Sequence, residues 1–306
     1  MEVVITKIGV VTAWGRGVQA FEQGLQEKKS ALQSHKALRF LESDLAGIAP
    51  NKAFLQYLQR RKASKLMTPA ARLAMDAVGQ ILEDCELNRE NCGLFVSVGR
   101  EPPDEGEAEP ALLASVDNGQ FSEELLATEG QRLYPPLLPL KTLPNMILGH
   151  LAMHFQLQGE NAACAGEGIS AIWEGYWSVV EGRCTQVLVG AADSVIDLGQ
   201  ARDLKRIGCV DAPGQAGVAF LMETLEQAQQ ANRKPIMFMK HQSTWYDKRR
   251  EPEQIGERLT ALIGYCGVVM PQLELLSMIL NLQSSIGQLS HNTSWNGLDL
   301  YQLSEA

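Results

Sequence analysis

Short apolar runs and amphipathic segments alternate along most of this chain. The first run, VVITKIGVVT, is rich in β-branched residues and predicts a strand and a turn over residues 2–14. In residues 17–32 apolar side chains recur every three or four positions, which predicts a helix. A second amphipathic helix is predicted over residues 68–85, with Thr68 as its cap and Pro69 at its first position.

Three later apolar runs predict buried strands. Residues 92–99 and 184–194 are almost continuous apolar strings, and residues 217–233 begin as a strand and continue as a helix. Strands that are apolar on both faces occur where helices cover both sides of a sheet. The alternation of such strands with helices therefore predicts the α/β class.

The segment GENAACAGEGISAIWEGYW, residues 159–177, places a cysteine ahead of an apolar helix. We predict this helix over about residues 168–181 and a central strand over about residues 185–191. The helix has a broad apolar face formed by Ile169, Ile172, Trp173, Tyr176, Trp177 and Val180. A helix N-terminus can lower the pKa of a nearby cysteine. The local sequence thus leaves two interpretations of Cys164, a nucleophilic thiolate or a small buried residue before a core helix.

Composition narrows the classes of function. The chain has 306 residues, of which 45% are hydrophobic, and a net charge of −9 without a basic stripe, which argues against nucleic-acid binding. Its six cysteines form no CxxC pair, so we expect reduced thiols, no metal and no cofactor. No apolar run is long enough to span a membrane and no secretory signal is visible, which predicts a cytoplasmic protein. Residues 101–110, EPPDEGEAEP, predict a solvated loop.

Four segments in order resemble the β-ketoacyl synthases, the condensing enzymes of fatty-acid and polyketide assembly, which have the thiolase fold. The segments are VVITKIGVVTAWGRGVQAFEQGLQEKKSAL, LPNMILGHLAMHFQLQGEN, GISAIWEGYWSVVEGRCTQVLVGAADS and DAPGQAGVAFLMETLEQAQQANRKPI, and they cover most of residues 1–236. The resemblance implies a thiolase-like layered αβαβα fold. It also implies an N-terminal ketosynthase-like half over residues 1–234 and a shortened C-terminal half over residues 235–306.

The chain departs from that family where the family's chemistry is carried. A condensing enzyme needs a thiolate for the acyl chain and two histidines that drive decarboxylation and stabilise the enolate and oxyanion. Aligned with the family's motif, Cys164 falls one place early, Thr260 stands at the lysine and Tyr265 at the second histidine. The segment of the first histidine is missing, and His150 occupies a structural position. We therefore predict no catalytic residue and a vestigial site of Cys164, Thr260 and Tyr265.

A silent copy of this fold can still complete the acyl tunnel of an active partner. The resemblance therefore implies a chain-length-factor-like subunit that forms a heterodimer with an active β-ketoacyl-ACP synthase in type II fatty-acid, polyketide or polyene biosynthesis. Trp173, Tyr176 and Trp177 are the predicted tunnel or interface residues, and the strand at 185–191 is the predicted pairing strand. The acyl carrier protein would be received by the partner, because this chain is acidic. Two alternatives stay open: a divergent active ketosynthase or acyltransferase that uses Cys164, and a stand-alone acyl-binding or scaffold protein.

Overall fold

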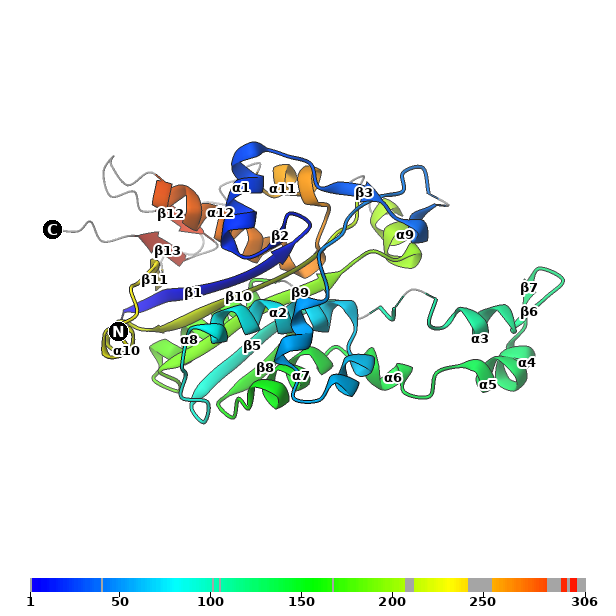
Figure 1. The fold of residues 1–306 in the computed structure, drawn as a ribbon, viewed down its shortest axis with the longest axis horizontal. Coiled ribbons are helices and arrows are strands. Elements are labelled where there is room, and N and C mark those ends of the chain that lie inside the picture. Colours follow the sequence, from blue (N-terminus) through cyan, green and yellow to red (C-terminus); the bar gives the residue numbers. More distant parts are fainter. Residues whose placement is uncertain are drawn as a thin grey trace.

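One large mixed sheet crosses the molecule (Figure 1). The computed structural model describes residues 2–39, 41–100, 102–104, 106–166, 168–206, 212–241, 255–284, 293–295 and 298–301. The strands of the sheet lie in the order β12-β13-β11-β1-β10-β9-β5-β8, with the short β2 paired to β1. Their bounds are β1 (Val3–Thr12), β2 (Gly15–Arg16), β5 (Cys92–Val98), β8 (Asn161–Ala165), β9 (Gln186–Ser194), β10 (Gln215–Thr224), β11 (Met237–His241), β12 (Thr293–Trp295) and β13 (Leu298–Tyr301).

The sheet combines two kinds of pairing. β5 runs parallel to both β8 and β9, whereas β9, β10, β1 and β11 pair antiparallel to one another in sequence along the sheet. The carboxyl ends of β5, β8 and β9 therefore lie at the same edge of the molecule. In open α/β sheets this edge is the usual position of a functional site.

Helices cover both faces of the sheet. Alternate residues of β9 contact two separate cores: Val189 belongs to the core that contains α8 (Ser170–Val180) and α12 (Met270–Ser284). Leu188 belongs to the core that contains α2 (Pro69–Glu83) and α7 (Met146–Phe155). This two-faced burial explains why β9 is apolar at consecutive positions. The predicted sheet with helices on both faces is confirmed.

The helix α2 begins and packs as its sequence indicates. The side chain of Thr68 accepts a hydrogen bond from the backbone N–H of Ala71 at 3.2 Å, and Pro69 is the first helical residue. The helix lies directly on β1, because a Cβ atom at Gly9 would come within 1.8 Å of the Ala77 carbonyl oxygen. Glycine at residue 9 thus permits the close approach of helix and strand.

Two predictions that bear on the site are confirmed. The helix expected over 168–181 is α8, and the strand expected over 185–191 is β9. The first predicted helix is shorter than expected: α1 (Val18–Glu27) ends where Lys28 adopts a left-handed conformation with φ of 51°. The chain then enters β3 (Leu32–Ser34) instead of continuing as a helix.

The remaining elements are short or lie near the ends of the sheet. They are η1 (Lys36–Leu38), β4 (Leu45–Gly47), η2 (Ala53–Tyr57), η3 (Arg61–Leu66), α9 (Leu198–Arg206), α10 (Leu225–Gln230), α11 (Ile255–Ile263) and η5 (Gly267–Val269). The C-terminal strands β11, β13 and β12 extend the sheet beyond β1. The α/β, thiolase-like fold class is confirmed, while the division at residue 234 stays a prediction.

An arm formed by residues 108–140 projects from the body (Figure 1). It contains α3 (Glu109–Leu113), β6 (Val116–Asp117), β7 (Gln120–Phe121), α4 (Glu123–Leu125), the π-helical turn η4 (Leu126–Gly130), α5 (Gln131–Leu133) and most of α6 (Leu138–Lys141). None of the helices in the described ranges is long and apolar enough to cross a membrane.

The strand predicted to pair with a partner is the wrong one. β9 lies between β10 and β5 and is hydrogen-bonded to a neighbour on each edge, so it has no edge to offer. Within the described residues, β8 ends the sheet on this side and pairs only with β5. The error arose because an apolar strand without charges is equally consistent with the centre and with the edge of a sheet.

Candidate functional site

Cys164 lies on β8, the edge strand, and not on the turn directly before a helix. It stands opposite Ser97 of β5, and its side chain is half-buried against the core beneath α8. After β8 the backbone turns through Gly166, with φ of 107°, before α8 begins at Ser170. The cysteine is therefore part of the sheet, where its backbone geometry is set by pairing with β5.

The environment of Cys164 opposes ionisation. Burial raises the pKa of the Cys164 thiol above its ordinary value, and the nearby charge of Glu174 raises it further. A nucleophilic cysteine needs the reverse, a cation, a histidine or a helix N-terminus that lowers the pKa. The possibility that α8 would activate the thiol is therefore not supported, and we expect the thiol form at neutral pH.

The other two residues of the predicted vestigial site lie on separate elements. Thr260 is buried on α11, and Tyr265 follows that helix. The backbone N–H of Tyr265 donates to the Ala212 carbonyl at 2.6 Å, which places this segment beside Pro213. Their assignment as degenerate counterparts of catalytic residues stays a prediction.

The histidines of α7 are structural groups in the interior. His150 is 2% exposed, and its Nε2 lies 3.1 Å from the Leu66 carbonyl oxygen. Burial lowers the pKa of both His150 and His154, and their rings stack with centroids 6.2 Å apart. His150 thus connects α7 to η3, in agreement with the structural role expected for it.

The three aromatic side chains of α8 form one cluster with two environments. Trp173 and Trp177 stack with centroids 6.3 Å apart, and Tyr176 meets the Trp177 ring edge-on at 5.5 Å. Tyr176 is buried in the core, whereas both tryptophans are half-buried. Of the three predicted tunnel or interface residues, the two tryptophans therefore reach the surface of α8.

A buried carboxylate closes the carboxyl end of β9. Asp193 accepts hydrogen bonds from the backbone N–H groups of Ser194 at 2.8 Å and Val268 at 3.1 Å. A Cβ atom at Gly267, where φ is 57°, would lie 2.0 Å from Asp193 Oδ2. Asp193 thus links η5 to the carboxyl end of β9. Sequence reasoning missed it, since a single aspartate in an apolar strand has no local signal.

We predict that the stability of the chain falls as pH rises through the titration of Asp193. Burial raises the pKa of Asp193 to about 6, although the amides of Val268 and Ser194 act in the opposite direction. The folded state then binds the proton more tightly than the unfolded chain, in which the aspartate has its ordinary pKa of 3.8. The stabilisation that Asp193 contributes is fully present below pH 3.8 and is lost as the pH rises through about 6. The free energy of unfolding changes by up to about 3 kcal/mol over this range. Chemical denaturation between pH 4 and 7.5 measures it.

The control for this prediction is Asp193→Asn, which cannot titrate. Its stability should vary less between pH 4 and 7.5 than that of the native chain, whatever its absolute value. Equal slopes for the two proteins would show that Asp193 is not the group responsible.

A groove of about 1480 Å³ lies between the body and the arm, at the carboxyl ends of β5 and β9. Its apolar lining includes Leu112, Leu113 and Tyr134 from the arm and Ile196 and Leu198 from the body. Cationic side chains also line it, namely Lys36, Arg39, Arg100, Arg202 and Arg206. Neither tryptophan of α8 belongs to this lining. Acidic side chains line it in equal number, and Arg100 pairs with Asp203 at 2.9 Å. The groove therefore combines apolar walls with a margin of mixed charge, which suits a ligand with an apolar chain.

The arm carries most of the exposed apolar surface in the described part of the chain. Eight of the twelve large apolar side chains exposed there belong to it: Leu112, Leu113, Val116, Phe121, Leu133, Tyr134, Leu137 and Leu140. Leu113 alone is 66% exposed. Such a concentration of exposed apolar side chains on one projecting segment is typical of an interaction site.

An exposed basic face contrasts with the acidic balance of the chain. Five cations lie between residues 51 and 67, a range without any acidic residue: Lys52, Arg60, Arg61, Lys62 and Lys65. None of them makes an ion pair within the residues that the structure describes. No basic stripe was expected from the sequence, yet Arg60, Arg61, Lys62 and Lys65 form a local run at η3, and Lys52 directly precedes η2.

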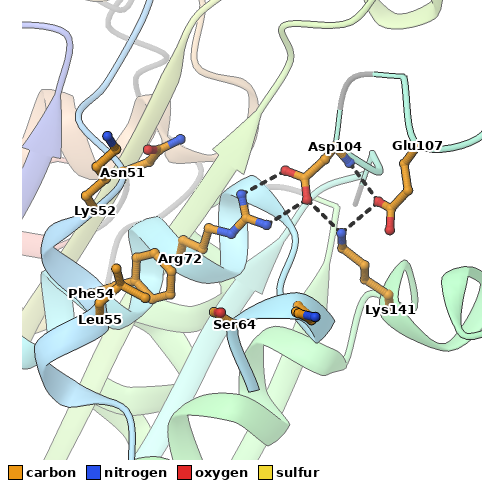
Figure 2. Close-up of a pocket in the computed structure, with 10 residues that line it drawn as sticks. Asn51, Lys52, Phe54, Leu55, Ser64, Arg72, Asp104, Glu107 and Lys141 are labelled. Atoms are coloured by element: carbon orange, nitrogen blue, oxygen red, sulfur yellow. Dashed lines mark hydrogen bonds and ion pairs between the residues drawn. The ribbon is translucent and has the colours of Figure 1, made fainter. Parts of the chain in front are cut away.

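A smaller pocket of about 500 Å³ separates the basic face from the base of the arm (Figure 2). Arg72 of α2 makes two hydrogen bonds to Asp104, and Lys141 of α6 reaches both Asp104 and Glu107. Two carboxylates of the predicted solvated loop are therefore partly buried in ion pairs, a correction of that expectation. The acidic run was assigned to solvent because its partners are distant in sequence.

Metal binding finds no support in the described ranges. No group of three or more histidine, cysteine, aspartate or glutamate side chains there is arranged to hold a metal ion. The five cysteines within those ranges are free thiols, and Cys209 lies outside them.

Comparison with known proteins identifies a family over most of the chain. The family model described as "Beta-ketoacyl synthase, N-terminal domain" matches residues 1–220. No curated protein sequence matches the chain. Among solved structures, the ishigamide ketosynthase/chain length factor is 17% identical, with a TM-score of 0.66 and 98% of each chain covered.

Two further structures share the fold. One is a chain of AntDE:AntF, a type II PKS acyl-carrier protein in complex with its ketosynthase bound to the hexaketide. It is 12% identical, with 98% of each chain covered and a TM-score of 0.67. The other is the ketosynthase from module 6 of the bacillaene synthase from Bacillus subtilis 168, also 12% identical. The match covers 79% of this chain and 44% of that chain, with a TM-score of 0.56. At such identities these likenesses concern the fold alone.

Proposed function

Because this chain belongs to the β-ketoacyl synthase family, we propose that it is a non-catalytic, chain-length-factor-like subunit of a β-ketoacyl-ACP synthase. The observation that carries the proposal is the state of Cys164. The thiol lies in the family's nucleophile region, yet burial and Glu174 raise its pKa, and neither histidine of α7 is directed to it in the contacts described. A condensing reaction has no activated nucleophile here.

An active ketosynthase is the proposed partner, and β8 is the proposed pairing strand. β8 is short, uncharged and, within the described residues, unpaired on one edge. Such an edge is a template for pairing with a strand of another chain. Beside it, α7 presents the uncharged exposed positions Asn145, Gly149 and Met153 at intervals of one helical turn. On the other face of the sheet, Trp173 and Trp177 offer half-buried aromatic surface. An edge strand flanked by an uncharged face of α7 and by the tryptophans of α8, with Glu174 between them, favours an extended interface.

The acyl tunnel is proposed to form where the arm and the strand ends meet the partner. The exposed apolar side chains of the arm would then be covered by the ketosynthase and by the growing chain. Trp173 and Trp177 stay candidates for the interface, while the buried Tyr176 would act through the core of α8. The arm was not recognised in the sequence, because its short helices lack a continuous apolar period.

The acyl carrier protein is proposed to reach the complex through the partner, with the basic face of this chain as an additional contact. Acyl carrier proteins are typically acidic, and the five cations between residues 51 and 67, which make no ion pair within the described residues, supply complementary charge. The net charge of −9 is therefore a poor guide to this surface. Such a contact would mainly affect the association rate and its salt dependence.

Co-expression with ketosynthases encoded near this chain tests the proposal. The complex should contain one copy of each subunit by native mass spectrometry and should condense malonyl and acyl thioesters, whereas this chain alone should not. Condensation by the isolated chain would favour the divergent enzyme. A stable monomer that ignores every ketosynthase offered would favour the stand-alone scaffold.

Replacing the Cys164 thiol should leave the activity of such a complex nearly unchanged. We expect Cys164→Ala to alter the rate of product formation less than about twofold, because a protonated thiol without a base contributes nothing to acyl transfer. The measurement is the rate of product formation by the purified complex. The matched control is the same substitution at the nucleophile of the ketosynthase, which should abolish product. Loss of activity on Cys164→Ala in an assembled complex would show that this chain is catalytic.

A further inference from the structure

We infer that Arg72, Asp104, Glu107 and Lys141 form an ionic clasp that fixes the direction of the arm, and that these are positioning residues for product length. The role in product length rests on the proposed function, while the clasp is a property of this chain. Arg72 Nη1 and Nη2 donate to the two Asp104 oxygens at 2.8 and 2.6 Å. Lys141 Nζ donates to Asp104 Oδ2 at 2.8 Å and to Glu107 Oε2 at 2.7 Å. Figure 2 shows the four side chains converging at one side of the pocket.

The clasp joins three segments that are distant in sequence. Asp104 and Glu107 lie on the chain that leads into the arm, Lys141 ends the chain that returns from it, and Arg72 belongs to α2 in the body. Asp104 is the centre, since it accepts hydrogen bonds from both cations. Both ends of the arm are therefore held to one helix of the body through a single carboxylate.

Burial makes these ion pairs stronger than ordinary surface pairs. The Lys141 side chain is 3% exposed and that of Arg72 17% exposed, while Asp104 and Glu107 are 37% and 26% exposed, so solvent screens these pairs only in part. Burial would raise the pKa of Asp104, but hydrogen bonds from Arg72 and Lys141 outweigh it and hold the pKa below its ordinary value. A buried ammonium group that lost its carboxylates would be strongly destabilised where it lies, so breaking the clasp favours movement of the stem.

The clasp lies at the base of the arm, where a small change of angle moves the whole arm. The arm extends from the body on two stems, and its helices pack mainly on one another (Figure 1). A small rotation at the base is amplified at the exposed side chains of α3 and β7, which include Leu113 and Phe121. The clasp thus determines which apolar side chains of the arm reach the partner and its acyl chain.

Hydrogen exchange of the full-length chain tests the clasp directly. In Arg72→Met and in Lys141→Met, backbone amides at the base of the arm, residues 107–112 and 138–143, should exchange at least about tenfold faster, while those of β9 and β10 stay unchanged. Lys141→Arg should restore slow exchange, because it keeps a cation within reach of both carboxylates. The matched control is Arg132→Met, which removes an exposed ion pair with Glu129 inside the arm and should change nothing at the base. Unchanged exchange of the arm in both clasp variants would overturn the proposal.

Two additions keep the test decisive. If Lys141→Met does not fold, Glu107→Gln removes one of the two carboxylates of Lys141 with little change of shape, and a several-fold faster exchange is expected. In the complex with a ketosynthase, Lys141→Met should broaden the distribution of product lengths at an unchanged subunit ratio. A released arm with an unaltered product distribution would overturn the positioning role, whereas failure of any complex to form would overturn the proposed function and leave the exchange result standing.

Discussion

Proline at residue 163 should prevent this chain from pairing with the proposed ketosynthase partner while its own fold persists. The backbone N–H of Leu94 donates to the Glu160 carbonyl at 2.8 Å, so the polar groups of residue 160 point toward β5. These groups alternate in direction along a strand, which turns those of Ala163 toward the open edge. Ala163→Pro removes an outward N–H and places a ring where a partner strand would lie. We expect affinity to fall roughly 100-fold, about 3 kcal/mol.

The measurement is the dissociation constant of the co-purified subunits, determined by analytical ultracentrifugation. Ala163→Ser is the matched control, because it changes the side chain and keeps the N–H. Circular dichroism should show the same secondary structure for both variants, since a proline at an edge position leaves the ladder to β5 intact. Undiminished pairing of a folded Ala163→Pro variant would show that the partner binds elsewhere.

Loss of the Arg233 guanidinium should destabilise this chain far more than the loss of an exposed cation. Glu223 is fully buried and Arg233 is 10% exposed, with Nε and Nη2 bonded to the two carboxylate oxygens at 2.8 and 2.5 Å. Hydrogen bonds to Glu223 are the main cause that raises the pKa of Arg233. Among the described residues, Arg233→Met leaves the buried carboxylate with the Thr6 hydroxyl and the Gln186 amide as hydrogen-bond partners. The free energy of unfolding should fall by about 3–5 kcal/mol.

Urea denaturation measures this loss, and two further variants serve as its controls. The double variant Arg233→Met with Glu223→Gln should recover most of the stability, because the buried charge is then gone. The exposed pair of Arg132 and Glu129 is the matched control, and Arg132→Met should cost less than about 1 kcal/mol. Equal losses for Arg233→Met and Arg132→Met would contradict the importance of burial.

The sequence by itself determined two things: the elements that surround Cys164, and the family to which the chain belongs. The helix α8 was predictable from its helical period and the strand β9 from its continuous apolar run. The cap of α2 was predictable because Thr68 and Pro69 act on their immediate neighbours. Four family-like segments in order were sufficient to indicate the α/β, thiolase-like fold. Their departures at Cys164 predict a silent site, which stays a prediction.

Only the tertiary structure decided which surfaces are available. The order of strands places β8 at the edge and β9 at the centre, and nothing in the apolar pattern of either strand distinguishes the two positions. Asp104 was assigned to a solvated loop, yet its partners Arg72 and Lys141 come from residues 32 and 37 positions away in sequence. The Asp193 carboxylate is likewise held by an amide 75 positions away. Local periodicity records which face of an element is apolar, whereas edges, ion pairs and buried charges depend on contacts that form only when distant segments pack together.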